Sequence, residues 1–406
     1  MGPSEAQVRE RVAPVEDPDL RRGIGELGML RSIDVGRRSV TVVLALPVAR
    51  WPAADALTER VTAALGGGGE PTRARVELAV MTDEERASLH RRLAAGGPSA
   101  PDPGDAAASD HDHGRGHDHG HALPRRPGAA PGPLGHEEGR PNRFMIPGSK
   151  TRVVGVSSGK GGVGKSSVAV NLALALAARG REVGLLDADV YGFSVPKMLG
   201  VTQAPVAIDE LLVPPVVHDV RCLSMGFFVP DAQPVIWRGP MLHKALEQFL
   251  VDAYWGEPDY LLIDMPPGTG DVALSLGQYL PRTEVLVVTT PQPAAQRVAQ
   301  RSAFAARQLS LSVRGVVENM SWFTGDDGTR YELFGSGGGE ALAGALEVPL
   351  LGRIPLVPEL RRGADDGVPV RVSDPDGEAT RAFDALADRL EGIGPARIYR
   401  RELTLR

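Results

Sequence analysis

A glycine-rich segment in the middle of the chain has the residue types and spacing of a phosphate-binding loop. Residues 159–166 read GKGGVGKS and fit the pattern G-x-x-x-x-G-K-[ST]. Glycines let a backbone close around phosphate oxygens, and N–H groups at a helix N-terminus supply positive potential. We expect Lys165 to reach the β- and γ-phosphates of a nucleotide and the Ser166 hydroxyl to ligate Mg²⁺. The predicted nucleotide contacts of this loop are Gly159, Lys160, Gly161, Gly162, Val163, Gly164, Lys165, Ser166 and Ser167.

Aspartates follow the strands that are expected to flank this loop. Asp187 and Asp189 close the run VGLLDAD, and Asp264 closes DYLLID. Ligands of an open α/β sheet bind outside the carboxyl ends of its parallel strands, so these side chains should meet beside the loop. Asp264 fits the carboxylate that holds Mg²⁺ through its water shell. The alternative interpretation is that these aspartates only cap loops.

The surrounding elements supply the strand–loop–helix context that the motif requires. Residues 152–157 form an apolar strand, and residues 166–180 have the pattern of a helix that ends at a glycine. Near-continuous apolar strands between helical patterns predict a doubly wound, mostly parallel α/β sheet covered on both faces. We assign this P-loop domain to residues 148–395. Its further strands are expected at 182–187, 260–264, 284–290, 312–318 and 350–354.

Residues 1–95 predict a separate small α+β domain. Some of its runs are β-branched or alternate polar with apolar residues, as strands do, and others have helical spacing. Thr82 has the position of a helix N-cap. The expected elements are strands at 38–46 and 73–81 and helices at 55–65 and 83–93.

Residues 96–147 are expected to be a flexible linker, because they are rich in Pro, Gly, Ala, Asp and His and nearly lack large apolar side chains. The run HDHGRGHDHGH within it has imidazoles that could bind Zn²⁺, Ni²⁺ or Cu²⁺. A hydrophilic spacer without a metal is the alternative interpretation. The candidate metal ligands are His111, His113, His117, His119 and His121.

Bulk composition limits the classes of function. The net charge of −6 and the pI near 5.9 argue against a surface that coats nucleic acid. We find no apolar run long enough to span a membrane and no signal peptide, so we expect a cytoplasmic protein without a membrane partner. The single cysteine, Cys222, excludes an intrachain disulfide and a zinc site built from cysteines.

A second lysine in the loop indicates a particular group of ATPases. Because Lys160 follows the first glycine, the sequence resembles the deviant Walker A ATPases, which include ParA, MinD, the nitrogenase iron protein and the Mrp/ApbC proteins. The resemblance implies a homodimeric ATP hydrolase in which Lys160 contacts phosphates bound by the other subunit. It also implies that Asp189 orients the attacking water and that Asp187 supports the Mg²⁺ shell. Asn319, after the run RGVVE, would contact adenine.

Longer strings narrow the resemblance to the Mrp/ApbC iron–sulfur carrier ATPases. VIWRGPML, DMPPGTGDVALSLGQ, VENMSWF, FGSGGGEALA and LLGRIPL all look like that family. DPDLRRGIGELGMLRSIDV in the N-terminal domain resembles an iron–sulfur-assembly accessory domain. The resemblance implies a carrier that uses ATP and Mg²⁺, binds a [4Fe–4S] cluster and passes it to iron–sulfur apoproteins or works with assembly proteins.

The sequence departs from the family where cluster ligands are expected. A C-P-x-C motif usually follows the ENMS-aromatic string, and residues 324–328 read TGDDG instead. Trp51 stands where the accessory domain usually has a cysteine before proline. Cys222 is left as either a cluster ligand or a buried structural thiol. The chain therefore either carries clusters by an unusual ligand set or kept the ATPase without that cargo.

Two other functions compete with a cluster carrier. The histidine run could make the chain a Zn²⁺ or Ni²⁺ chaperone. A ParA- or MinD-like positioning ATPase would need a basic DNA-binding stripe or an amphipathic basic C-terminal helix. The chain ends in ARIYRRELTLR, which has arginines but no apolar helical face, and the P-loop domain has no dense basic cluster. We therefore expect no nucleic-acid partner and no membrane partner.

Overall fold

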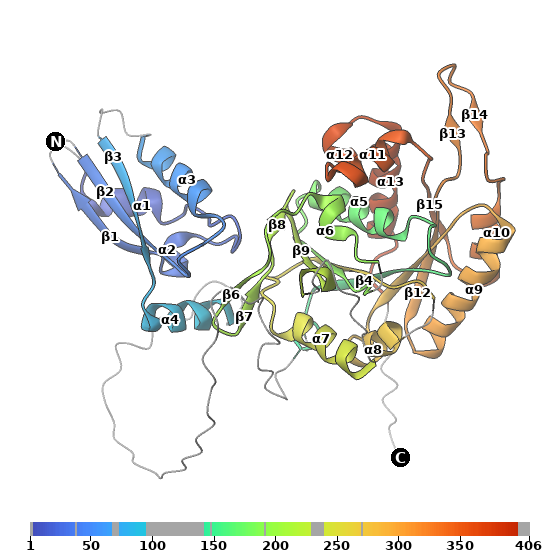
Figure 1. The fold of residues 1–406 in the computed structure, drawn as a ribbon, viewed down its shortest axis with the longest axis horizontal. Helices are drawn as coiled ribbons and strands as arrows, with labels where there is room; N and C mark the ends of the chain where they lie inside the picture. Colours follow the sequence, from blue (N-terminus) through green and yellow to red (C-terminus); the bar gives the residue numbers. More distant parts are fainter. Residues whose placement is uncertain are drawn as a thin grey trace, which may run out of the picture.

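The structure is a computed structural model that describes residues 3–36, 39–66, 73–94, 142–146, 148–190, 192–228, 239–268 and 271–396. Two folded parts are visible in Figure 1, a smaller N-terminal domain in blue and a larger P-loop domain. The histidine run at 111–121 lies outside the described residues.

Eight strands form the central sheet in the order β15-β12-β11-β4-β10-β5-β9-β8. Neighbouring strands run parallel, except β8 and β9. Every residue of β4, β5 and β10 is buried, as both faces of this sheet are covered. The predicted doubly wound, mostly parallel sheet is confirmed. Its strands are β4 (Arg152–Ser158), β5 (Val183–Asp187), β8 (Val216–Val217), β9 (Val220–Ser224), β10 (Tyr260–Asp264), β11 (Glu284–Thr289), β12 (Ser312–Glu318) and β15 (Leu350–Arg353).

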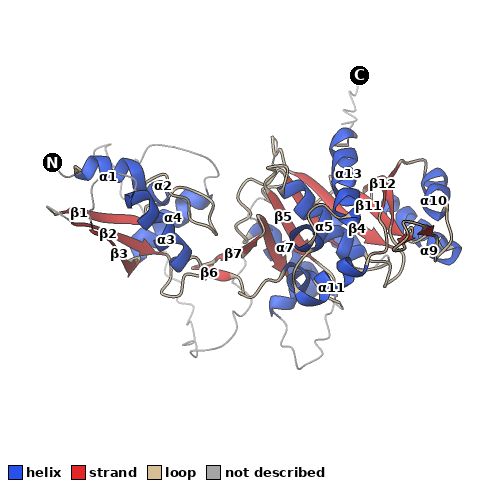
Figure 2. Ribbon diagram, turned by 90° about the horizontal axis from the view of Figure 1, so that it is seen from above, coloured by secondary structure: helices blue, strands red, loops and turns tan. Residues whose placement is uncertain are grey.

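Alternate residues of each strand face different helix layers, which Figure 2 shows on the two sides of the sheet. Val154 packs in one cluster with α5 and α13, whereas Val153 packs in another with α7 and α8. Helices α9 and α10 cover the β11–β12 end of the same sheet. The helices are α5 (Lys165–Ala177), α6 (Val195–Leu199), α7 (Gly239–Val251), α8 (Asp271–Tyr279), α9 (Pro293–Gln308), α10 (Gly338–Leu346), α11 (Pro358–Asp366), α12 (Val370–Ser373) and α13 (Glu378–Gly392).

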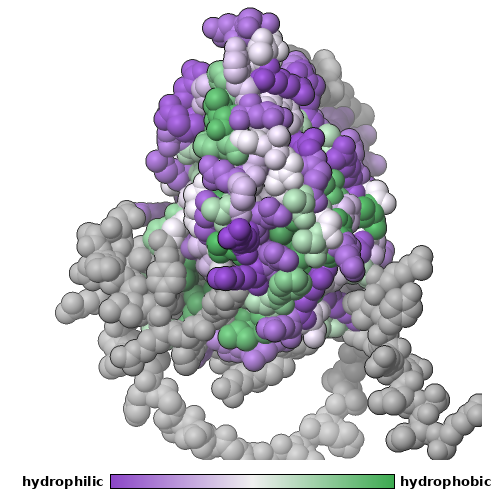
Figure 3. Space-filling view, turned by 90° about the vertical axis from the view of Figure 1, so that its right-hand side faces the viewer, coloured by the Kyte–Doolittle hydropathy of each residue, from purple (hydrophilic) through white to green (hydrophobic). Residues whose placement is uncertain are grey.

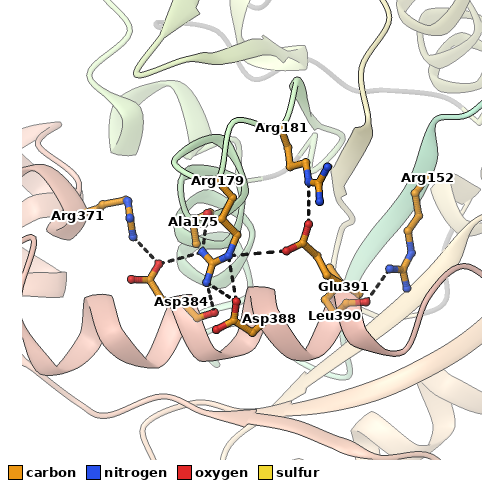
Figure 4. A network of polar contacts seen from close by, with 9 residues as sticks. All are labelled: Arg152, Ala175, Arg179, Arg181, Arg371, Asp384, Asp388, Leu390 and Glu391. Carbon is orange, nitrogen blue, oxygen red and sulfur yellow. Dashed lines mark hydrogen bonds and ion pairs between the residues drawn. The ribbon is translucent and has the colours of Figure 1, made fainter.

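An arginine network holds α13 against α5, the helix that begins at the phosphate-binding loop (Figure 4). The Arg179 guanidinium donates to Asp388 at 2.8 Å and to Asp384 at 3.2 Å. Arg181 donates to Glu391 at 2.8 Å. These ion pairs are partly exposed, and such pairs contribute only about 0–1 kcal/mol each. Their main effect is therefore to orient α13 on α5, whose contact is otherwise apolar.

The N-terminal domain is a three-stranded sheet in the order β1-β2-β3 with four helices. All four elements predicted there are present, whereas α1, α2 and β1 were not predicted, because they are short and carry many polar residues. Thr82 caps α4 as expected: its hydroxyl accepts from the Glu85 amide at 3.2 Å, and the Glu85 carboxylate accepts from the Thr82 amide at 2.7 Å. The elements are α1 (Glu5–Val12), α2 (Ile24–Leu27), β1 (Leu30–Val35), β2 (Ser39–Leu46), α3 (Ala54–Gly66), β3 (Arg73–Val80) and α4 (Asp83–Ala94).

Candidate functional site

The loop between β4 and α5 has glycine where a side chain would not fit. A Cβ on Gly159 would lie 2.3 Å from the backbone nitrogen of Ala299 in α9. Gly164 has a φ of +80°, and a Cβ there would lie 2.1 Å from Nδ2 of Asn319. The loop thus packs closely against the middle of α9 and against the residue that follows β12. The other predicted contacts Gly161, Gly162, Val163 and Ser167 lie in this loop or in the first turn of α5.

The side chains predicted to bind phosphate and Mg²⁺ meet in one buried network. Nζ of Lys165, which is 6% exposed, lies 2.6 Å from Oδ1 of Asp264 and 3.5 Å from Oδ2 of Asp189. The Ser166 hydroxyl donates to Oδ2 of Asp264 at 2.6 Å. Asp264 is in register with Asp187 across the β10–β5 pair, so both carboxylates reach the same edge of the sheet. The structure brings together residues from three separate parts of the sequence.

The carboxylates of Asp187 and Asp264, at the ends of β5 and β10, are fully buried, and this changes their pKa values. Burial, and secondly the nearby Asp264, raise the pKa of Asp187 to about 7. Burial also raises the pKa of Asp264, against the opposing effect of Lys165. Mg²⁺ prefers such a set of carboxylate and hydroxyl oxygens, and a cation beside them would favour the ionised forms. Ser166, Asp187 and Asp264 therefore fit the magnesium ligand set expected from the sequence.

Asp187 is itself held by donors that sequence reasoning missed. Its Oδ2 accepts from the Ser224 hydroxyl at 3.0 Å and from the Val195 amide at 3.3 Å, and its Oδ1 accepts from the Asp189 amide at 3.1 Å. Ser224 ends β9, which pairs with β5, so the two side chains are neighbours across the sheet. A serine at the end of a strand gives no signal in the sequence until the strand pairing is known.

Asn319 and Lys160 lie at the loop, but in different surroundings. Asn319 is 2% exposed, and its Nδ2 donates to the Val163 carbonyl at 2.9 Å, so this hydrogen bond stabilises the conformation of the loop. Lys160 is half-exposed, and its carbonyl accepts from the Ser158 hydroxyl at 3.0 Å. The adenine contact of Asn319 and the reach of Lys160 into a second subunit stay predictions.

Of the two interpretations left open for Cys222, a cluster ligand or a buried structural thiol, the structure supports the buried thiol. Cys222 lies within β9 and is 0% exposed, in the core between the sheet and α5. Burial raises the pKa of the Cys222 thiol well above its ordinary value, which disfavours the thiolate that a metal needs. Trp51, at the other expected thiol position, is also buried, and its indole Nε1 donates to Oδ2 of Asp17 at 2.8 Å. Cys222 and Trp51 are therefore both part of a packed hydrophobic core.

The segment at 324–328, where the cysteine motif was expected, is the turn of a small hairpin. Its strands are β13 (Phe323–Thr324) and β14 (Arg330–Tyr331). One carboxylate holds the base of this hairpin: Glu378 of α13 accepts from Trp322, Thr324 and Arg330 at 2.9, 2.8 and 3.2 Å. The hairpin lies on the side of the molecule seen in Figure 3, where apolar residues lie among hydrophilic ones. Hydrogen bonds to the Glu378 carboxylate therefore hold this hairpin, where thiolates were expected to bind a cluster.

Within the described ranges, no group of three or more His, Cys, Asp or Glu residues is placed to hold a metal ion. No helix among those residues is long and apolar enough to span a membrane. The candidate Mg²⁺ site described above has two carboxylates, Asp187 and Asp264, and the Ser166 hydroxyl.

Comparisons with protein families and with individual proteins indicate the same family for this chain. Residues 149–391 match the family described as NUBPL iron-transfer P-loop NTPase, and residues 5–78 match an iron–sulfur cluster assembly protein family. The chain is 43% identical over 396 residues to the iron–sulfur cluster carrier protein of Mycobacterium tuberculosis, covering 96% of this chain and 93% of the relative. It is 37% identical over 386 residues to the same-named protein of Synechocystis, covering 93% and 94% respectively.

A solved structure is similar to the P-loop domain. It is a nucleotide-binding protein from Archaeoglobus fulgidus in complex with ADP, 33% identical, with a TM-score of 0.50. The match covers 58% of this chain and 93% of that protein.

Proposed function

The chain belongs to the iron-transfer P-loop NTPase family, and from this membership we propose that it is an iron–sulfur cluster carrier that binds and hydrolyses Mg²⁺-ATP. The observation that carries the nucleotide part is the buried network of Lys165, Ser166 and Asp264 at the carboxyl edge of the sheet. A lysine and carboxylates are rarely buried together unless they are paired or bind a ligand. Here their partners come from separate elements that meet at the phosphate-binding loop.

The chain's own residues account for binding and positioning. On nucleotide binding, Lys165 exchanges its contact with Asp264 for the β- and γ-phosphates. Ser166, Asp264 and Asp187 would hold Mg²⁺, which supplies charge neutralisation at the phosphates. We propose that Asp189, whose carboxylate lies 3.5 Å from Nζ of Lys165, orients the attacking water beside the γ-phosphate.

Cargo and partners follow from the family and from the departures described above. We propose a homodimer in which Lys160 completes the partner subunit's nucleotide site. Clusters would be transferred to iron–sulfur apoproteins or received from assembly proteins. Because Cys222 is buried, the cluster ligands are proposed to be other than a C-x-x-C pair and other than this thiol.

Anaerobic reconstitution with ferrous iron and sulfide tests the carrier function. Iron and sulfide per chain and the visible spectrum would be measured for the wild type, for Cys222→Ser and for a chain that lacks residues 111–121. We expect bound sulfide and a charge-transfer band in all three samples, because the first change affects a buried side chain and the second removes a segment without cysteine.

Two outcomes would contradict the proposal. A sample that hydrolyses ATP but binds no sulfide and shows no band would mean that the ATPase works without cluster cargo. Binding of Zn²⁺ or Ni²⁺ without sulfide, lost on deletion of 111–121, would favour a metal chaperone instead. Loss of the band in Cys222→Ser alone would show instead that Cys222 is a cluster ligand.

A further inference from the structure

The N-terminal domain and the P-loop domain share one hydrophobic cluster. A hairpin of β6 (Val206–Ile208) and β7 (Leu211–Val213) projects from the P-loop domain towards α4, as Figure 1 shows. Ile208 and Val213 are buried in the same cluster as Leu20 and other core residues of the N-terminal domain. The two domains are thus packed against each other, and the linker is not their sole connection.

A buried arginine of β9 fastens this junction. Arg221 is 3% exposed, and its terminal nitrogens donate to the backbone carbonyls of Asp19 and Leu20, the latter at 3.3 Å. Its guanidinium lies 5.1 Å from the ring centroid of Tyr254, whose hydroxyl also donates to the Leu20 carbonyl, at 3.2 Å. Separation of the domains would break the hydrogen bonds between the Arg221 guanidinium and these carbonyls, and hydrogen bonds of a charged group are stronger than those between neutral groups.

Ion pairs at the rim add orientation. Arg21 of the N-terminal domain pairs with Glu182 at 3.1 Å and with Asp219 of the P-loop domain. Arg86 pairs with Asp209 at 3.3 Å. These side chains are partly exposed, so each pair contributes little energy. The buried Arg221 is therefore the polar contact that matters most for holding the domains together.

Arg221 and the magnesium site lie at opposite ends of one strand. β9 spans Val220–Ser224 and pairs in parallel with β5, with Ser224 in register with Asp187. Ser224 lies three residue steps beyond Arg221 along the strand, about 10 Å. At the far end, the Ser224 hydroxyl donates to Asp187 at 3.0 Å. Both ends of β9 are pinned by hydrogen bonds, one to the N-terminal domain and one to the predicted Mg²⁺ ligand.

We propose that the N-terminal domain is a positioning partner of the Mg²⁺-nucleotide site: by binding Arg221 it holds β9 where Ser224 orients Asp187. Ser224 is a positioning residue, because it acts through Asp187 and contacts neither nucleotide nor metal. This inference rests on the Mg²⁺-nucleotide site proposed above, whose regulation it describes. It gives the N-terminal domain, which lacks the usual thiol, a role in the P-loop domain.

The test compares ADP binding by the full chain with and without Mg²⁺. Arg221→Met keeps the volume of the side chain and removes the donors, Ser224→Ala breaks the contact with Asp187, and Arg86→Ala is a rim control. We expect Arg221→Met and Ser224→Ala to reduce the Mg²⁺-dependent gain in ADP affinity by about fivefold or more. ADP affinity without Mg²⁺ should not change, because Lys165 and the loop are untouched. Arg86→Ala should behave as the wild type, and Arg221→Lys should restore part of the gain.

Hydrogen exchange of the same samples separates the two steps of the inference. Faster exchange at Asp19–Leu20 in Arg221→Met, with an unchanged Mg²⁺-dependent gain, would refute the coupling between the junction and the site. Unchanged exchange there would refute the role of Arg221 in the junction. If Arg221→Met does not fold, Tyr254→Phe removes one hydrogen bond to the Leu20 carbonyl and answers the same question.

Failure of the proposed nucleotide function would be recognised separately. If the wild type binds no ADP, the Mg²⁺-nucleotide site is wrong, and the positioning role falls with it. The exchange measurement would then still decide whether Arg221 fastens the two domains, because that reading needs no ligand.

Discussion

One consequence of the proposed magnesium site is that Asp187→Asn should stabilise the metal-free protein while it removes a proposed magnesium ligand. Asp187 is 0% exposed, and burial raises its pKa from 3.8 to about 7. A carboxyl group whose folded pKa is raised destabilises the folded state once the pH exceeds the unfolded pKa. The cost grows as pH rises from about 4 and is complete above about 7. An amide at this position does not titrate and has no such cost.

The size of the effect follows from proton linkage. With pKa values of 3.8 unfolded and about 7 folded, the cost of Asp187 is on the order of 2 kcal/mol at pH 5 and on the order of 4 kcal/mol at pH 8. The difference between the two pH values, on the order of 2–3 kcal/mol, does not depend on hydrogen bonds that the amide gains or loses with Ser224 or Val195. We therefore expect the stability of Asp187→Asn relative to the wild type to increase by this order between pH 5 and pH 8.

Urea unfolding followed by circular dichroism, in EDTA at both pH values, measures this difference. Asp388→Asn is a suitable control, because Asp388 is a largely exposed partner of Arg179 on the same domain. A relative stability of Asp187→Asn that is the same at pH 5 and pH 8 would refute the reasoning. It would mean that Asp187 is already ionised and adequately paired in the metal-free protein. Mg²⁺-dependent ADP binding should be lost in this variant at either pH.

Two further substitutions test the nucleotide site, and a third tests the placement of Cys222. Lys165→Ala should bind no Mg²⁺-ATP in equilibrium dialysis, because the phosphates lose their main cationic partner; wild-type binding would disprove the assignment. Asp189→Ala should retain ATP binding but slow hydrolysis at least about a hundredfold in a phosphate-release assay, and normal turnover would move the water-orienting role elsewhere. Cys222→Ser should lower the thermal unfolding midpoint, by an amount equivalent to about 1–3 kcal/mol, because a hydroxyl replaces a thiol in an apolar core. An unchanged midpoint would contradict the buried placement.

Local patterns made the framework of this protein predictable. Six of the eight strands of the central sheet are runs of apolar residues between helical patterns, and they begin and end within one residue of the predicted positions, whereas β8 and β9 were not predicted as strands of this sheet. The phosphate-binding loop could be recognised because its function needs particular residues at short, constant spacing, from Gly159 to Ser166. Asp187, Asp189 and Asp264 could be assigned because each lies at the carboxyl end of a recognisable strand. These features depend on neighbours in the sequence, which a single chain displays directly.

What only the tertiary structure decided are contacts between residues far apart in sequence. Cys222 was open to two interpretations until the sheet placed it in the core, where desolvation keeps a thiol neutral. Glu378 became the anchor of the β13–β14 hairpin because α13 returns to that side of the molecule. Ser224 contacts Asp187, and Arg221 contacts the N-terminal domain, because β9 lies between β5 and that domain. Hydrogen bonds and burial depend on distances in space, and residue types along one chain do not specify which distant side chains the fold brings together.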